Sequence, residues 1–312
     1  MTKFYTLLRN SIFVLVAVGT SLGLVKVYNA TNNFALVSSF QAATGSNFIY
    51  RIKQLPNGNV ATVANEPIVK IWNPSNNWAL VLQYTSHTGI VYAIEVIDDN
   101  FVATGGADGV IRVWNFITGF DLEIINVGTP LIYDLKLQGN LCNLECALSN
   151  GSVNVYNLNS GIFSYTQVVN FPVLSPSFMS LEISKKQITY AGAGDGTIRT
   201  WMNGLWRVQI SYTNTFIGHT NYVEGLKFLS VDTLASSSLD RTIRLWNTTT
   251  GQLMYTLISD GQMNWNTIDL LCPGVMVSTS QAGTIKLWNI TAGSLISTPV
   301  NSGLTFGTLA VL

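Results

Sequence analysis

Charged residues are scarce in this chain of 312 residues. Asp, Glu, Lys and Arg make up only 10% of it, and 16 basic residues balance 16 acidic ones. A protein that binds nucleic acid usually carries a clustered excess of Lys and Arg, because contacts to phosphates release bound counterions. This chain has neither the excess nor the cluster, so we expect no nucleic-acid partner. Hydrophobic residues make up 47%, which indicates that most of the chain lies in strands or in a core.

Cysteine and histidine are rarer still. The three cysteines (Cys142, Cys146 and Cys272) are an odd number without a CxxC motif, which favours buried thiols in a reducing compartment over a disulfide framework. No His or third thiol lies close in sequence to Cys142 and Cys146, so a metal site is disfavoured. The pattern G-x-S-x-G occurs at GTSLG (19–23), but no Ser sits in a nucleophile elbow of that type, because this stretch falls in a segment that can be read as two strands joined by a turn, and no pair of carboxylates stands out. We therefore expect no metal, no cofactor and no catalytic residue.

The N-terminus allows two interpretations. In residues 1–21, Lys3 and Arg9 precede an apolar run, and Ala17 and Gly19 lie where a signal-peptidase motif would be, so the segment is compatible with a secretory signal. Alternatively, FVLVAVGTSLGLVKVYN (13–29) forms two strands joined by a turn. We favour the strands, because a signal peptide has no reason to align with the repeat described next. This interpretation predicts a cytoplasmic or nuclear protein without a membrane segment, and the signal predicts a secreted one.

A short alternating motif that ends in an aromatic residue, usually followed by Asn, recurs seven times. Examples are IVKIWN (68–73), VIRVWN (110–115) and TIRLWN (242–247). The intervals between the aromatic residues are 42 to 45 residues, which is the period of a four-stranded propeller blade. The aromatic anchors are Tyr28, Trp72, Trp114, Tyr156, Trp201, Trp246 and Trp288.

The rest of each repeat also has the pattern of strands. Runs with a period of two are separated by Gly, Asn and Asp, and no stretch of ten residues has a convincing helical period. We therefore predict an all-β chain in which residues 1–312 form a single seven-bladed β-propeller. The first blade lacks a clear innermost strand, whereas residues 303–312 align with the innermost strands of other blades. We expect this C-terminal strand to pair with the N-terminal strands in residues 11–40, so that the ring has no open edge.

These motifs resemble those of the WD-repeat (β-transducin-like) family, and the resemblance covers nearly the whole chain. In that family a His, a Ser or Thr, a turn Asp and a Trp form a hydrogen-bonded tetrad that joins adjacent strands. Two blades match all four positions, with His87, Thr104, Asp108 and Trp114 in blade three and His219, Ser236, Asp240 and Trp246 in blade six.

The other blades depart from this pattern. Blade five has Ala191 at the Ser position, blade seven has Ala282 at the Asp position, and blades one and four have Tyr28 and Tyr156 in place of Trp. Each lost hydrogen bond is worth about 1 kcal/mol. We expect these losses to make the blades less rigid without removing them.

The resemblance also implies where a partner binds. In the family, the favoured positions lie three and five residues after the repeat His, at the mouth of the central channel. Among them here are Phe48, Tyr50, Tyr92, Tyr133, Tyr222, Glu224, Asn264 and Asn266. Tyrosines beside a polar arc suit peptide recognition, because Tyr buries a large area at low rotamer cost and offers a hydroxyl. The alternative is that these tyrosines only fill the channel.

We therefore expect a non-enzymatic scaffold that binds a protein or peptide at the top face, as a monomer or as a subunit of a hetero-complex. Two alternatives stay open. One is a secreted propeller with an enzymatic or carbohydrate-binding role, and the other is an excised regulatory domain of a larger protein.

Overall fold

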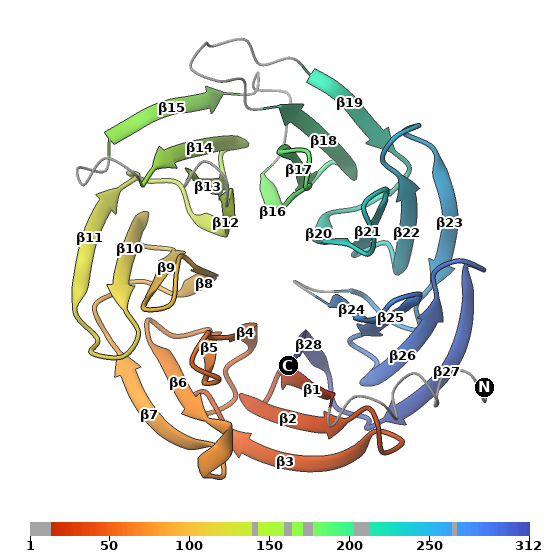
Figure 1. Ribbon diagram of the computed structural model, residues 1–312, viewed down its shortest axis with the longest axis horizontal. Coiled ribbons are helices and arrows are strands. Elements are labelled where there is room, and N and C mark those ends of the chain that lie inside the picture. Colours follow the sequence, from red (N-terminus) through yellow and green to blue (C-terminus); the bar gives the residue numbers. More distant parts are fainter. Residues whose placement is uncertain (1–13, 139–142, 159–163, 171–176, 203–211, 264–266) are drawn as a thin grey trace.

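The computed structural model describes residues 14–138, 143–158, 164–170, 177–202, 212–263 and 267–312. Within these residues, seven antiparallel sheets of four strands each are arranged in a ring (Figure 1). Each sheet has one strand next to the ring axis and one at the circumference. The predicted all-β, seven-bladed propeller is therefore confirmed.

The blades are numbered in chain order, and their strands are given from the innermost to the outermost. Blade one contains β28 (Phe306–Val311), β1 (Leu15–Thr20), β2 (Leu24–Asn29) and β3 (Ala35–Gln41). Blade two contains β4 (Ile49–Gln54), β5 (Val60–Ala64), β6 (Val69–Asn73) and β7 (Ala79–Tyr84), with a 3-10 turn η1 (Pro74–Asn76) before β7. Blade three contains β8 (Val91–Val96), β9 (Phe101–Gly106), β10 (Val110–Asn115) and β11 (Asp121–Asn126). Blade four contains β12 (Ile132–Gln138), β13 (Asn143–Leu148), β14 (Ser152–Asn157) and β15 (Ser164–Asn170). Blade five contains β16 (Phe178–Ile183), β17 (Ile188–Ala193), β18 (Thr197–Met202) and β19 (Tyr212–Ile217). Blade six contains β20 (Val223–Phe228), β21 (Thr233–Ser238), β22 (Thr242–Asn247) and β23 (Leu253–Ile258). Blade seven contains β24 (Ile268–Cys272), β25 (Val275–Thr279), β26 (Thr284–Asn289) and β27 (Ser294–Asn301).

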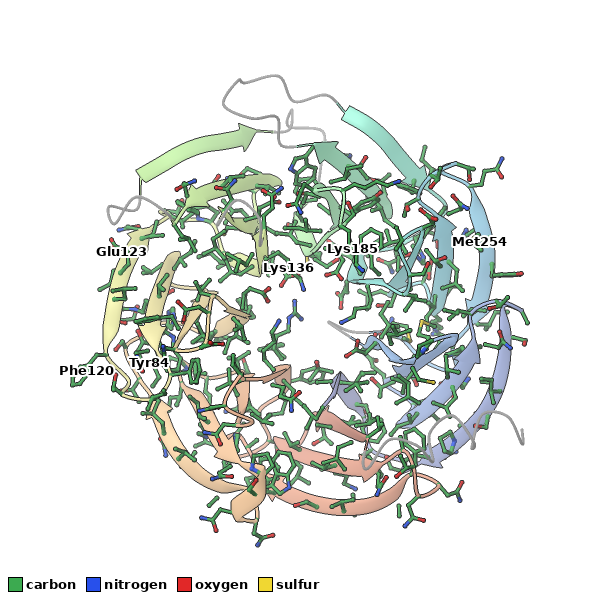
Figure 2. All side chains as sticks on the ribbon, in the orientation of Figure 1. Tyr84, Phe120, Glu123, Lys136, Lys185 and Met254 are labelled. Atoms are coloured by element: carbon green, nitrogen blue, oxygen red, sulfur yellow. The ribbon has the colours of Figure 1, made fainter. Side chains whose placement is uncertain are left out.

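In blades one, two, three, six and seven, burial falls from the middle strands to the outer strand. All five residues of β5 are buried, whereas the outer strands β7 and β11 are largely exposed. Figure 2 shows Phe120 and Glu123 at the circumference and Lys136 near the axis. Neighbouring sheets cover both faces of the middle strands, which explains why even strands with several small or polar residues, such as β9 (FVATGG) and β21 (TLASSS), are almost completely buried. The turns and the inner rim are left to contact other molecules.

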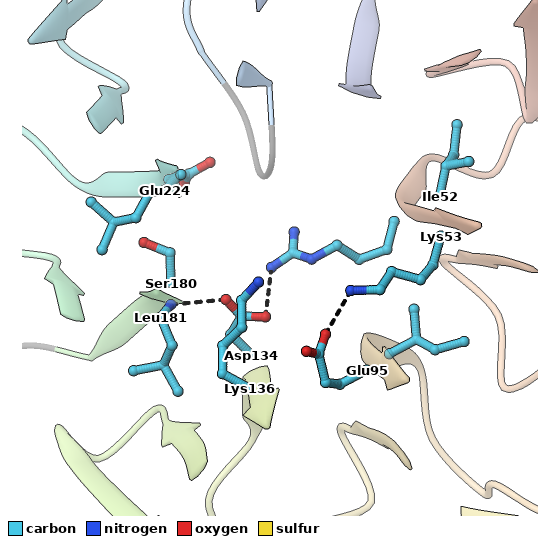
Figure 3. A pocket seen from close by; sticks show the side chains of 12 residues that line it. Ile52, Lys53, Glu95, Asp134, Lys136, Ser180, Leu181 and Glu224 are labelled. Carbon is cyan, nitrogen blue, oxygen red and sulfur yellow. Dashed lines mark hydrogen bonds and ion pairs between the residues drawn. The ribbon is translucent and has the colours of Figure 1, made fainter. Parts of the chain in front are cut away.

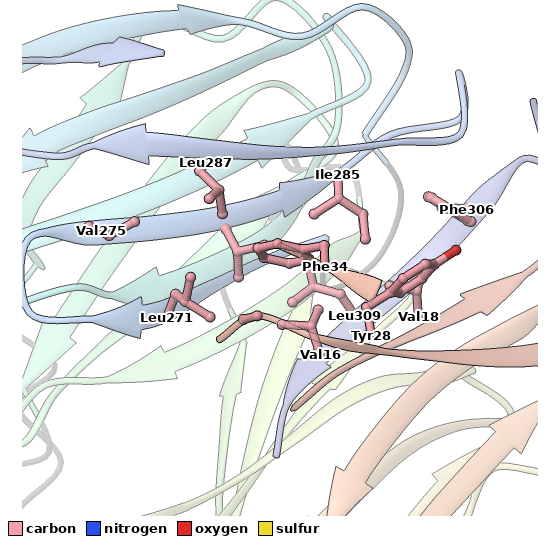
Figure 4. Close-up of a cluster of buried hydrophobic side chains, with 12 residues drawn as sticks. Val16, Val18, Tyr28, Phe34, Leu271, Val275, Ile285, Leu287, Phe306 and Leu309 are labelled. Carbon is pink, nitrogen blue, oxygen red and sulfur yellow. The ribbon is translucent and has the colours of Figure 1, made fainter. Parts of the chain in front are cut away.

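Both ends of the chain contribute to blade one. β28 pairs with β1, with Ala310 opposite Ala17 and Leu309 opposite Val18. Val18 and Leu309 belong to one apolar cluster with Leu287 of blade seven (Figure 4). The predicted pairing of residues 303–312 with the N-terminal strands is confirmed, and Leu15–Thr20 is a strand of the ring. Residues 1–13, the first part of the alternative signal segment, lie outside the described residues.

The Asn that follows the aromatic anchor shapes the turn to the outer strand. In blade six, the Asn247 side-chain oxygen accepts hydrogen bonds from the amides of Thr249 and Thr250, at 2.9 Å each. Asn73, Asn115 and Asn289 each accept two backbone amides in the same way. Asn and Asp favour such turns because their short side chains reach the backbone two and three residues ahead. The repeated WN dipeptide is therefore explained by turn formation.

Alternating charges connect the innermost strands at every second blade boundary. The Lys53 ammonium lies 2.7 Å from Glu95, that of Lys136 lies 3.1 Å from Glu182, and that of Lys227 lies 2.8 Å from Asp269. In each pair the cation comes from an even-numbered blade and the acid from the next blade. We call these six residues the charge ladder. Because the partners lie on different blades, the ladder joins blades two to three, four to five, and six to seven.

Each acid of the charge ladder also reaches forward to the following blade. Glu182 accepts a hydrogen bond from the Phe228 amide, and Asp269 accepts one from the Val311 amide. The residue before the donating amide is Lys227 in the first case and Ala310 in the second. In a ring with an odd number of blades, strictly alternating charges would place two like charges on one pair of neighbouring blades. The uncharged Ala310 at the seam removes that conflict.

Candidate partner-binding site

Two hydrogen-bonded tetrads hold the turns that surround the inner rim. In blade three, Nδ1 of His87 lies 2.8 Å from Asp108, and Nε2 lies 2.8 Å from the Thr104 hydroxyl. The Trp114 indole donates to the same hydroxyl at 3.0 Å. Burial lowers the pKa of His87, and the Asp108 carboxylate offsets this only in part. A neutral His87 that donates from Nδ1 and accepts at Nε2 satisfies all four residues.

Blade six repeats the arrangement. His219 lies 2.8 Å from Asp240 and 2.7 Å from Ser236, and the Trp246 indole donates to Ser236 at 2.8 Å. Burial alone would raise the pKa of Asp240, but hydrogen bonds from His219 and Thr242 outweigh it and hold the pKa well below its usual range. A carboxylate that accepts several hydrogen bonds is stabilised in its charged form. Both histidines of the chain therefore serve the blades.

Blade two holds its turn with other residues. Glu66 occupies the place of the turn Asp and accepts hydrogen bonds from the Thr44 amide and hydroxyl, and Lys70 lies 2.8 Å away. Burial alone would raise the pKa of Glu66, but these hydrogen bonds lower it. The Trp72 indole donates to Thr62 at 2.9 Å. Thr44 thus supplies hydrogen bonds to the acid, as the His does in blades three and six.

Blade seven compensates for Ala282 from the opposite side of the turn. Asp260, in the segment before β24, accepts hydrogen bonds from the Ser280 hydroxyl at 2.7 Å and the Thr284 hydroxyl at 2.9 Å. The Trp288 indole still donates to Ser278 at 2.8 Å. Blade seven therefore keeps an acid at this turn, but the acid comes from the segment before β24 and not from position 282. The sequence shows Asp260 about one period after the blade-six His, which is the signal that could have identified it.

The inner rim is built from β-bulges. In β4 the pairing with β5 passes from Ile49 to Arg51, so Tyr50 is the extra residue of a bulge. The same irregularity in the other blades falls at Gly307, Tyr92, Tyr133, Met179 and Glu224. A bulge redirects a side chain out of the regular alternation. Six blades thus turn one residue each toward the rim, at the position that family resemblance implies for binding.

Four of the predicted binding residues form a continuous aromatic arc. Ring centroids are 5.7 Å apart for Phe48 and Tyr50, 5.2 Å for Tyr50 and Tyr92, and 5.7 Å for Tyr92 and Tyr133. All four side chains are half-buried. The Tyr50 hydroxyl donates to Asn65, in the turn between β5 and β6, at 3.4 Å. The arc therefore lies at the end of the ring that carries these turns.

Glycine completes the arc on the side of blade one. A Cβ atom at Gly307 would lie 2.2 Å from the Phe48 ring, a distance that no side chain could tolerate. On the other side, Tyr222 is 40% exposed, whereas Glu224 is buried. Asn264 and Asn266 lie outside the described residues. We use "the mouth" for Phe48, Tyr50, Tyr92, Tyr133, Tyr222 and Glu224, the predicted residues that the structure does describe.

A cavity of about 40 Å³ is lined by Arg51 and Asp134, the residues that directly follow Tyr50 and Tyr133 of the mouth in sequence (Figure 3). Arg51 reaches across it to Asp134, with 3.4 Å between the guanidinium and the carboxylate, and Asp134 accepts the Leu181 amide at 2.8 Å. Glu224 also lines the cavity. Burial raises the pKa of Glu224 to about 8, although the positive charge of Arg51 acts in the opposite direction. Neither Arg51 nor Asp134 was predicted from the sequence, because their contact joins blades two and four.

No three or more His, Cys, Asp and Glu residues in the described part of the chain gather in a way that could hold a metal ion. No helix in the same part of the chain is long and apolar enough to cross a membrane.

Comparisons with known proteins point to one family. The family model described as "WD domain, G-beta repeat" matches residues 78–115 and 210–247, which end at the Asn after the Trp of the two complete tetrads. The ribosome biogenesis protein YTM1 of Eremothecium gossypii is 30% identical over 166 residues, which are 48% of this chain and 34% of that protein. The guanine nucleotide-binding protein subunit beta of Zea mays is 24% identical over 170 residues, covering 52% of this chain and 45% of that one. The matches thus span less than half of these relatives.

A solved structure gives the same picture of the fold. The computationally designed Ika8 protein superposes with a TM-score of 0.71 at 23% sequence identity, covering 94% of this chain and 86% of that chain. At this level of identity the similarity concerns the fold alone.

Proposed function

Because the chain belongs to the WD-repeat family of β-propellers, we propose that it is a non-enzymatic interaction platform that binds a protein or peptide at the mouth. The observation that carries this proposal is the aromatic arc made by Phe48, Tyr50, Tyr92 and Tyr133 on successive innermost strands. Aromatic residues with one exposed side and a polar tip are the usual anchors of protein interfaces.

The way in which the arc is held supports the proposal. The bulges at Tyr50, Tyr92 and Tyr133 are fixed because the residues before and after each bulge pair with the neighbouring strand. The rings also restrict one another through their contacts. A partner would therefore meet side chains that lose little further freedom on binding, so that more of the contact energy is available for affinity.

The relatives extend the proposal to a cellular setting. Several relatives are named as ribosome biogenesis proteins. We infer that this chain likewise works inside the cell, as a monomer or as a subunit of a larger protein complex. The strand Leu15–Thr20 supports this setting over secretion, because removal of a signal ending near Gly19 would destroy a strand of blade one. We also propose that residues 1–312 form one folding unit. The alternative is that this unit is a regulatory domain of a larger protein.

The double variant Tyr92→Ala, Tyr133→Ala tests the mouth directly. Removing two neighbouring anchors is expected to lower partner retention more than tenfold, because each aromatic hot spot is worth about 2 kcal/mol. The melting temperature is expected to change little, since both side chains are only half-buried. The measurement is quantitative mass spectrometry of proteins from the source cells retained on the immobilised chain, with a parallel thermal denaturation.

Asp240→Ala is the matched control. It removes the acceptor for His219 and Thr242 and is expected to cost about 2 to 3 kcal/mol of stability, while partner retention at low temperature stays unchanged. The proposal fails if the double tyrosine variant loses stability but keeps its partners, since the tyrosines would then be packing residues.

A further inference from the structure

Glu224 differs from the other charged residues around the cavity. Arg51 is paired with Asp134, Lys53 with Glu95, and Lys136 with Glu182. For the Glu224 carboxyl, the described residues provide no hydrogen bond and no ion pair, although only 7% of the residue is exposed. Burying a charged group without a partner is costly. Within the described part of the chain, the cavity therefore has one acidic group whose ionised form has no partner.

We propose that Glu224 is the counter-ion for a cationic side chain, an Arg or Lys of the partner, that enters the cavity through the mouth. This inference rests on the proposed function and specifies the chemistry of the partner. A single carboxylate suits a single monovalent cation, whereas calcium or magnesium would need several oxygen ligands.

The surroundings of Glu224 fit such an occupant. The cavity volume of about 40 Å³ holds a few water molecules, and a charged group of similar size could replace them. Tyr133 lies near Glu224. Burial raises the pKa of Tyr133, and electrostatic interactions with Tyr92, Tyr222 and Glu224 raise it further. Tyrosine rings attract cations through their faces. Tyr133, near Glu224, thus favours a positive charge at this place, and the lining cations Arg51, Lys53 and Lys136 are each paired with another carboxylate.

Arg51 does not fulfil this role for Glu224. Its guanidinium is directed to Asp134 and to the backbone oxygens of Tyr50 and Tyr133. Its positive charge lowers the pKa of Glu224 only in part, so that the value is still about 8. Binding of a cation should therefore depend on pH, because only the ionised carboxylate attracts it. The titratable and charged groups on the strands around Glu224 are Arg51, Lys53, Tyr92, Glu95, Tyr133, Asp134, Lys136, Glu182 and Asp269.

The experiment uses Nα-acetyl-arginine methylamide as the cation and Nα-acetyl-citrulline methylamide as its neutral isostere. Binding to the full chain is followed by NMR with ¹³C-labelled glutamate side chains, at pH 6.5 and pH 9. The arginine compound is expected to shift the Glu224 carboxyl signal and to bind at least tenfold more tightly at pH 9, where the carboxylate is ionised. The citrulline compound is expected not to bind.

Two variants complete the test. Glu224→Gln should abolish binding, and Glu123→Gln, which removes a carboxylate at the circumference (Figure 2), should leave it unchanged. Equal binding of the neutral compound, the absence of a pH effect, or full affinity in Glu224→Gln would each overturn the inference. These probes need no protein partner, so their failure would leave the proposed function to its own test with Tyr92 and Tyr133.

Discussion

Deletion of residues 303–312 is expected to abolish the cooperative thermal unfolding of the chain. The deletion removes β28, so β1 becomes an open edge and the apolar cluster at the seam loses Phe306 and Leu309, both fully buried. Loss of a large buried side chain costs about 3 kcal/mol or more. Exposed strand edges also promote aggregation. Differential scanning calorimetry should show a broad, strongly lowered transition or none.

A milder variant keeps this test measurable if the truncated chain does not fold. Leu309→Ala leaves the backbone pairing of β28 intact and is expected to lose about 3 kcal/mol. Adding a synthetic peptide of residues 303–312 to the truncated chain should restore part of the transition. A truncated chain that melts like the intact one would show that the ring does not depend on its seam.

Glu95→Lys is expected to produce the second large loss. Glu95 accepts from Lys53 at 2.7 Å, and burial alone would raise its pKa, but the charges of Lys53 and Lys136 outweigh this and lower it. A lysine at this position would face both cations with little access to water. We expect a loss of about 3 to 5 kcal/mol, as for other buried pairs in which one partner is removed, measured by urea denaturation.

Glu123→Lys provides the matched control, because it makes the same change of charge on the outer strand β11. We expect it to alter stability by less than about 0.5 kcal/mol. If the two variants proved equally stable, the charge ladder would be an incidental pairing that does not contribute to the ring.

Sequence alone gave the period, the number of blades and the closure, because each depends on patterns within one repeat or on its position in the chain. The tetrads of blades three and six could be predicted for the same reason, since all four residues of each tetrad lie within one repeat. The role of Asp260 was not predicted, since it compensates for Ala282 from another segment. Arg51 and Asp134 were missed because these residues, 83 positions apart in sequence, meet only once the ring is closed. The burial of Glu224 was likewise not predicted, because the residues around it come from β4, β12 and β16 as well as from its own strand.

The central claim, that the mouth holds the partner, is tested most directly by site-specific photo-crosslinking. A benzophenone amino acid replaces Tyr222 at the mouth or, as the control, Phe120 at the circumference (Figure 2). Phe120 is 76% exposed and Tyr222 is 40% exposed, so accessibility alone favours the control. The account predicts covalent partner adducts from position 222 and none from position 120; adducts that form only at position 120 would contradict it.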